Sequence, residues 1–254
     1  MPTPPARFAP APGYGEALAY IHDAGYSGFA QKAAPGLLRM LRRQGVTAGL
    51  VVDLGCGSGR WARELLHAGY QVLGIDLSPA MIRLARRIAP QARFKVGSLF
   101  EAELPPCRAV TSLGECVNYN LDGKSSRPSL SRLFKRIFRA LAPGGILVFD
   151  FAGPGRLPKR GPRVTWAGHD DWAVISVTRA RGCDKLIRQI TGFRRRGKHL
   201  RATGEVHDLR LYRADDLIQD LARCGFRARV VSGYGRLRFL EGIAGIVAVK
   251  PKKH

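Results

Sequence analysis

Acidic residues are scarce in this sequence of 254 residues, where 19 Asp and Glu stand against 42 Lys and Arg and the formal net charge is +23. A charge of this size raises the local concentration of polyanions, so nucleic acid has to be weighed as a partner. One dense stretch, residues 179–201, holds nine basic residues and a single acid, Asp184. We interpret most of the charge as an arginine-rich surface. The stretch nevertheless leaves an acidic substrate open, whose binding would weaken if Arg194, Arg195 and Arg196 were replaced with Ser.

Other absences exclude further classes of protein. The five cysteines are scattered, odd in number and without a C-x-x-C pair, so neither a disulfide framework nor a metal site is indicated. The longest apolar runs, such as residues 146–152 and 243–249, are shorter than the roughly 18–20 residues that span a bilayer. The N-terminal residues lack the apolar segment behind a basic start that a secretory signal requires. We therefore expect a cytoplasmic protein that does not bind a membrane.

Prolines dominate the start of the chain. Five of them lie within residues 1–13 and prevent regular hydrogen bonding, so we predict a flexible arm there and one domain over residues 14–254. Apolar residues then recur at intervals of three and four over residues 16–24 and 29–43, which indicates two helices. We predict that this segment, residues 14–45, forms a lid on the core.

Strand and helix patterns alternate through the middle of the chain. Helices are predicted at residues 60–68, 79–88, 129–141 and 214–224, and strands at 50–54, 71–75, 93–96, 109–113, 145–151, 226–231 and 243–250. Strict alternation is typical of a parallel sheet wrapped by helices on both faces. The sequence therefore predicts an α/β fold with a Rossmann-like, mostly parallel sheet of seven strands.

The pattern changes after residue 151. Three extended runs, residues 171–179, 185–195 and 200–212, are separated by short glycine-containing turns, which predicts three linked antiparallel strands. We expect these strands to lie in an insertion, residues 160–213, that follows the fifth strand and caps the edge of the sheet.

A glycine-rich turn lies between the first predicted strand and the next helix. Gly55, Gly57 and Gly59 permit backbone angles closed to other residues and let a ligand lie against the chain, while the helix N-terminus offers free N–H groups to an anion. Asp76 ends the next strand, where a carboxylate can accept hydrogen bonds from both hydroxyls of a ribose. Because NAD-binding domains also pair a glycine turn with an acid, this pairing alone does not decide between cofactors.

More specific features surround this turn in the segment VVDLGCGSGRWARELLHAGYQVLGID. The glycines have G-x-G-x-G spacing, Asp53 precedes the first by two residues, and Leu-Ser-Pro-Ala-Met-Ile follows Asp76. Together with the Ala-Leu-Ala-Pro-Gly-Gly turn at residues 140–145, they resemble class I S-adenosylmethionine-dependent methyltransferases over most of the chain. The antiparallel insertion is similar to that of small-molecule N- and O-methyltransferases. The resemblance implies S-adenosyl-L-methionine as cofactor and methyl transfer to an N or O atom of a small molecule.

The same resemblance implies which residues hold the cofactor. Asp53 would position the amine, Asp76 would bind the ribose, and Leu77 and Met81 would flank the adenine. Where many relatives carry an Asp for the adenine amino group, this chain has Ser98. The complete implied set is Tyr26, Asp53, Gly55, Cys56, Gly57, Gly59, Asp76, Leu77, Met81, Ser98, Leu99, Leu113 and Gly114.

Methyl transfer requires an acceptor that is brought close, aligned, shielded from water and, in some cases, relieved of a proton, so no fixed triad is expected. The acceptor would approach beyond the fourth strand, where Glu115, Asn118 and Tyr119 are the nearest polar groups. His207 lies on the last strand of the insertion, on the same face as Glu205. These four residues, Glu115, Asn118, Tyr119 and His207, are our catalytic candidates, each with a structural role as the alternative.

Three other functions stay open. The charge motivates an RNA methyltransferase, although residues 114–117 lack the [DNS]-P-P-[YF] segment of adenine-N6 enzymes, and Cys107 precedes the fourth strand, whereas cytosine-5 enzymes carry a cysteine after it. A noncatalytic protein could keep the Rossmann-like shape without binding the cofactor. An NAD-dependent oxidoreductase ranks third, because no Tyr-x-x-x-Lys pair lies at a suitable place.

Overall fold

A computed structural model describes residues 13–252, so the predicted arm lies outside the described residues except for Gly13. The N-terminal half comprises α1 (Glu16–Tyr26), α2 (Gly28–Arg43), β1 (Gly49–Leu54), α3 (Arg60–His67), β2 (Tyr70–Asp76), α4 (Pro79–Ile88), β3 (Arg93–Val96), β4 (Cys107–Ser112) and η1 (Cys116–Asn118). The remainder comprises α5 (Arg127–Ala140), β5 (Leu141–Ala152), η2 (Pro154–Arg156), β6 (Arg163–His169), β7 (Trp172–Ala180), β8 (Lys185–Arg196), β9 (His199–Arg210), α6 (Ala214–Arg223), β10 (Arg227–Val231), β11 (Gly233–Tyr234), β12 (Leu237–Arg238) and β13 (Ile243–Val249).

Seven strands form the main sheet in the order β10-β13-β5-β4-β1-β2-β3. The strands from β5 to β3 are parallel, and β13 runs antiparallel to both of its neighbours. The predicted α/β class and the Rossmann-like, mostly parallel sheet of seven strands are confirmed. The structure contains no helix, within residues 13–252, that is long and apolar enough to cross a membrane.

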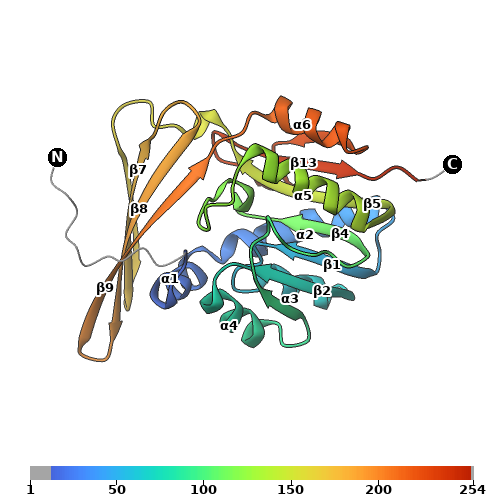
Figure 1. Ribbon diagram of the computed structural model, residues 1–254. Coiled ribbons are helices and arrows are strands. Elements are labelled where there is room, and N and C mark those ends of the chain that lie inside the picture. Colours follow the sequence, from blue (N-terminus) through green and yellow to red (C-terminus); the bar gives the residue numbers. More distant parts are fainter. Residues whose placement is uncertain (1–12, 253–254) are drawn as a thin grey trace.

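Helices cover both faces of this sheet (Figure 1). On one face α5 and α6 pack against Val52 and Phe149, and on the other α2, α3 and α4 pack against Val51 and Val148. Adjacent residues of one strand thus enter opposite cores, because side chains alternate across a sheet. Burial on both faces explains why β1 and β5 are continuous apolar runs in the sequence.

A second sheet, which we call the cap sheet, consists of β6, β7, β8 and β9 in that order. It stands at one end of the main sheet in Figure 1, with α1 beside it. Leu18 and Ile21 of α1 pack on Trp172 and Val174 of β7, and Ala19 packs on α4. Helix α1 therefore connects the cap sheet to the main sheet.

The cap sheet differs from the predicted insertion in having four strands instead of three. The missed strand, β6, is the outer strand that pairs only with β7. Its side chains are almost all exposed, so it lacks the apolar alternation by which strands are predicted. A second difference concerns the expected turn at residues 140–145: Ala140 ends α5, and residues 141–145 belong to β5, whose register against β4 shifts at this point.

Candidate active site

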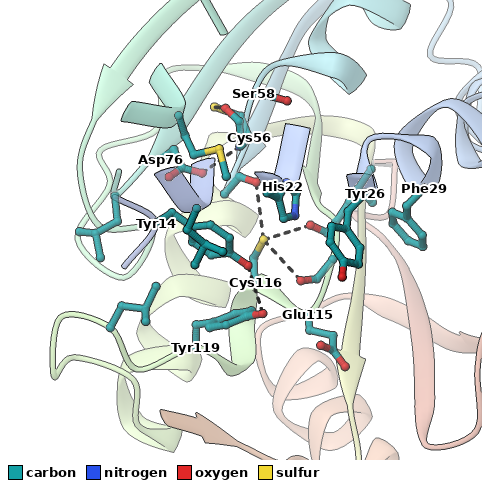
Figure 2. A pocket seen from close by; sticks show the side chains of 18 of the residues that line it. Tyr14, His22, Tyr26, Phe29, Cys56, Ser58, Asp76, Glu115, Cys116 and Tyr119 are labelled. Carbon is teal, nitrogen blue, oxygen red and sulfur yellow. Dashed lines mark hydrogen bonds between the residues drawn. The ribbon is translucent and has the colours of Figure 1, made fainter. Parts of the chain in front are cut away.

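A cavity of about 790 Å³ lies between the carboxyl ends of the parallel strands, the cap sheet and α1. Its volume is within the range of roughly 300–1,000 Å³ that small-molecule sites occupy. Figure 2 shows side chains from α1, from the glycine-rich turn after β1 and from the loop after β4 around this space. The end of the sheet where α/β proteins bind ligands is therefore hollow and enclosed by the insertion.

The glycine-rich turn is held in a conformation that only glycine adopts easily. Gly55, Gly57 and Gly59 have φ of 73°, 53° and 78°. The N–H groups of Gly55 and Cys56 both donate to the carbonyl oxygen of Ile75, at 2.7 and 3.1 Å, which fixes the turn against β2. A Cβ atom on Gly57 would meet no atom within 4 Å, so its backbone faces open space.

Asp76 ends β2 and is anchored by backbone groups. Its carboxylate accepts from the N–H of Gly57 at 2.8 Å and from the N–H of Ser78 at 2.9 Å. Burial raises the pKa of Asp76 above its usual value, while these two hydrogen bonds lower it. Each carboxylate oxygen keeps a further lone pair that is not used by these bonds.

Asp53 lies in β1, two residues before the glycine-rich turn, and accepts the last hydrogen bond of a short chain. The indole N–H of Trp61 donates to the Thr111 hydroxyl at 3.1 Å, and that hydroxyl donates to Asp53 at 2.7 Å. Asp53 is only 2% exposed. Burial raises its pKa to about 7, partly offset by the Thr111 bond.

The raised pKa of Asp53 makes stability depend on pH. A carboxyl whose pKa is about 7 in the folded state and near 3.8 when unfolded holds a proton in the folded chain that the unfolded chain releases. Between about pH 4 and pH 7 the free energy of unfolding should therefore decrease as pH rises. We expect Asp53→Asn, which retains an acceptor for Thr111, to flatten this decrease in urea unfolding at several pH values. An unchanged slope would show that Asp53 does not bind the proton.

The loop after β4 is fastened to β5 through Asp150. Its carboxylate accepts from the N–H of Gly114 at 2.9 Å, from the N–H of Glu115 at 2.6 Å and from the Tyr234 hydroxyl at 3.1 Å. Burial raises the pKa of Asp150 to about 6. Gly114 has a φ of 88°, and a Cβ atom there would meet nothing within 4 Å. This loop therefore presents bare backbone to the cavity opposite the glycine-rich turn.

Glu115 connects this loop to two arginines. Its carboxylate lies 3.5 Å from Arg156 of η2 and 3.4 Å from Arg188 of β8. Arg188 also donates to the hydroxyl of Tyr119 at 2.9 Å. These four side chains join the loop after β4 to the cap sheet.

Helix α1 supplies a further wall of the cavity. Its Asp23 receives two hydrogen bonds of 2.8 Å from Arg60 at the start of α3. Burial lowers the pKa of the neighbouring His22 to about 4, so this imidazole is neutral at physiological pH. His22 and Tyr26 stack with ring centroids 6.0 Å apart, and both rings are labelled in Figure 2.

Most residues singled out from the sequence line this cavity. Among the catalytic candidates, Glu115 and Tyr119 do so. The implied cofactor residues that line it are Tyr26, Asp53, Gly55, Cys56, Gly57, Asp76, Leu77, Met81, Ser98, Leu99, Leu113 and Gly114.

The structure does not bring Gly59, Asn118 or His207 to the cavity wall. A Cβ atom on Gly59 would lie 3.0 Å from Ala85, so this glycine allows α3 to pack closely against α4. The Asn118 amide is used by the backbone: it donates to the carbonyl oxygens of Ala152 and Arg210 and accepts from the N–H of Ala152. Asn118 thus joins the loop after β4 to β5 and β9.

His207 is 1% exposed and its Nε2 lies 2.8 Å from Glu205. Glu205 in turn accepts from the N–H groups of Tyr14 and Gly15. The expected shared face of His207 and Glu205 is present, and their pair holds the start of α1. His207 thus supports the start of α1 through Glu205 and does not line the cavity.

Sequence reasoning missed several residues of the wall. Asp150 lies within an apolar strand, and Arg156 and Arg163 lie in or beside an irregular segment without a motif. Of the nine basic residues in the stretch 179–201, only Arg188 lines the cavity. Arg194 instead stacks on Tyr20, with its guanidinium 3.5 Å from the ring centre. One sequence feature could have predicted that Arg188 faces inward: it alternates in its strand with the apolar residues Leu186 and Ile190, so all three lie on one face.

Known proteins similar to this chain are methyltransferases. The family model described as a methyltransferase domain matches residues 51–145. YqeM of Bacillus subtilis (strain 168), named as a candidate methyltransferase, is 26% identical over 194 residues, which cover 72% of this chain and 76% of that protein. Trans-aconitate 2-methyltransferase of Delftia acidovorans is 37% identical over 103 residues, which cover 39% of this chain and 37% of that enzyme.

A solved structure extends the likeness to the whole fold. The sugar N-methyltransferase KedS8 from Streptoalloteichus has a TM-score of 0.76 and 22% sequence identity, and the match covers 99% of both chains. The matched family segment contains the glycine-rich turn, Asp76 and the loop after β4. The chain carries a methyltransferase domain and is an S-adenosylmethionine-dependent methyltransferase, with S-adenosylmethionine as its methyl donor.

Proposed function

We propose that this enzyme transfers a methyl group to an N or O atom of a small molecule bound between the main sheet and the cap sheet. The observation that carries the proposal is that the glycine-rich turn, Asp76 and the inner face of the cap sheet line one cavity. An enclosed cavity of this volume suits a cofactor and a small acceptor side by side.

We also propose that the lining residues named above hold the cofactor. Three acids, the buried Asp53 and Asp150 and the partly buried Asp76, line this part of the cavity, and none of them forms an ion pair with a residue of the described chain. Burial raises the pKa of all three, and a positive charge bound beside them would lower it and stabilise the ionised carboxylates. S-adenosylmethionine carries a sulfonium and an ammonium group, whereas the pyrophosphate of NAD would be repelled. The residues present therefore fit the implied cofactor.

The roles of the chain's own groups follow from this arrangement. The chemistry that the bound cofactor supplies is a methyl carbon activated by its sulfonium. Gly57 and Gly114 leave room for close approach of a ligand, and α1 with the cap sheet excludes water. We retain the proposal that residues 14–45 act as a lid. Tyr119 and Glu115 are the catalytic candidates that the geometry supports, because both reach the cavity.

Relatives support a small acceptor. The names of two of them specify small molecules, trans-aconitate and a sugar. The match to the trans-aconitate enzyme covers 37% of that enzyme, and the similarity to the sugar methyltransferase is one of fold. The charge of +23 is the observation that favours RNA instead.

The test is incubation of the full chain with S-adenosylmethionine labelled in its methyl group. Pools of amines, phenols, hydroxylated sugars and carboxylic acids would be offered beside total RNA. We expect label to enter a small-molecule product. Label that precipitates with RNA and is released by ribonuclease would contradict the proposal. A boiled sample of the same protein controls for spontaneous methylation.

A further inference from the structure

The cap sheet presents a row of positively charged side chains to the cavity. From the register of the strands, Arg163 of β6 lies opposite Thr178 of β7, which lies opposite Arg188 of β8. All three side chains line the cavity. In antiparallel strands, residues opposite one another lie on the same face of the sheet. Two guanidinium groups therefore flank one hydroxyl on the inner face.

A third guanidinium joins this row from outside the cap sheet. Arg156 of η2 lines the same cavity. Burial lowers the pKa of Arg156, the negative charge of Glu115 raises it, and the positive charges of Arg163 and Arg188 lower it, so each of these two arginines lies close enough to Arg156 to act on its charge. Such crowding of like charges in a partly buried site is unfavourable unless an anion compensates it.

The compensation within the described chain is incomplete. Glu115 is the carboxylate that pairs with Arg156 and with Arg188. The side chain of Arg163 forms no hydrogen bond or ion pair with any residue between 13 and 252. Two of the three guanidinium groups thus share the Glu115 carboxylate. The fork of N–H donors on Arg163 is free to bind a carboxylate or phosphate.

The opposite side of the cavity has the reverse charge. Asp53, Asp76 and Asp150 lie around the glycine-rich turn and the loop after β4, where a cation is favoured. The charge distribution therefore divides the cavity into an acidic part and a basic part. A ligand in the basic part is favoured when it is an anion.

On this basis, and resting on the proposed function, we propose that the methyl acceptor carries a carboxylate or phosphate group that binds Arg163 and Arg188 beside Thr178. The cationic cofactor then occupies the acidic part and the anionic acceptor the basic part. This assigns the preference for an acidic substrate to Arg163 and Arg188 and not to Arg194, Arg195 and Arg196, none of which lines the cavity.

The experiment is calorimetric titration of the full chain, saturated with S-adenosylhomocysteine, with citrate and separately with pyrophosphate at constant ionic strength. Xylitol serves as the uncharged comparison. Arg163→Gln is the test variant, because the Arg163 side chain is exposed and forms no hydrogen bond or ion pair with the residues that the structure describes. Arg179→Gln is the matched control, because it removes one positive charge from an exposed position next to Thr178 in β7 that does not line the cavity.

We expect citrate or pyrophosphate to bind and xylitol not to bind, and the tighter anion identifies the group. Arg163→Gln should weaken anion binding about tenfold or more, because a charge-assisted bond is lost. Arg163→Lys should restore part of it, and Arg179→Gln should leave it nearly unchanged. Equal anion affinity in Arg163→Gln and the unaltered chain would overturn this proposal, as would absence of anion binding while S-adenosylhomocysteine binds. Failure of S-adenosylhomocysteine itself to bind would overturn the proposed cofactor site instead.

Discussion

Replacement of Asp76 by Ala is expected to reduce the affinity for S-adenosylhomocysteine by about 100-fold or more. Two hydrogen bonds from ribose hydroxyls to a carboxylate contribute roughly 1.5–3 kcal/mol each, and a tenfold change in affinity corresponds to about 1.4 kcal/mol. The substitution also removes the hydrogen bond of 2.8 Å that the N–H of Gly57 donates to Asp76, so the glycine-rich turn is held less firmly. Both effects act in the same direction.

Calorimetric titration with S-adenosylhomocysteine, and with NADH as the alternative ligand, measures this loss. Asp76→Asn separates the contributions, because its amide oxygen can still accept from Gly57 while the negative charge is removed. Glu103→Gln, at an exposed acid after β3, is the control for a general change of charge. Wild-type affinity in Asp76→Ala would exclude Asp76 from the cofactor site, and tight NADH binding would contradict the proposed cofactor geometry. Thermal unfolding of each variant shows whether the fold is retained.

Gly36→Ala should lower the free energy of unfolding by about 3 kcal/mol, although helix propensity predicts the opposite sign. Within a helix, Ala is favoured over Gly by roughly 1 kcal/mol. Gly36 lies in α2, however, and a Cβ atom there would be 2.3 Å from both the carbonyl carbon and the carbonyl oxygen of Tyr234. Backbone cannot rotate away as a side chain can, so overpacking outweighs propensity.

Gly28→Ala is the matched control for this prediction, because Gly28 is also in α2 and a Cβ atom there would meet nothing within 4 Å. It should leave stability unchanged or raise it slightly. Urea unfolding of the two variants measures the contrast, and equal stabilities would contradict the packing argument. Because the Tyr234 hydroxyl donates to Asp150, which holds the loop after β4, Gly36→Ala should also weaken S-adenosylhomocysteine binding.

Local sequence patterns were sufficient to predict the elements that lie nearest the cofactor part of the cavity. The G-x-G-x-G spacing and Asp76 specify a turn and a strand end whose geometry depends on neighbouring residues, and both are where the sequence predicted them. The alternation of helix and strand was equally readable, because burial on both faces of a parallel sheet leaves continuous apolar runs. The exposed strand β6 left no such pattern and was missed.

The acceptor part of the cavity depended on contacts between distant segments. Asn118 and His207 are polar residues near the expected site, yet tertiary hydrogen bonds use their side chains to hold β5, β9 and the start of α1. Arg163 and Arg188 come from separate strands and share one face only because β6, β7 and β8 pair in one register, and Arg156 joins them from η2. The sequence by itself determined the fold class, the glycine-rich turn and the acid that follows it, since these follow from short-range periodicity and backbone sterics. Which charged side chains of the cap sheet line the cavity was decided by the tertiary structure, because a shift of one residue in strand register would turn Arg163 and Arg188 to the other face of that sheet.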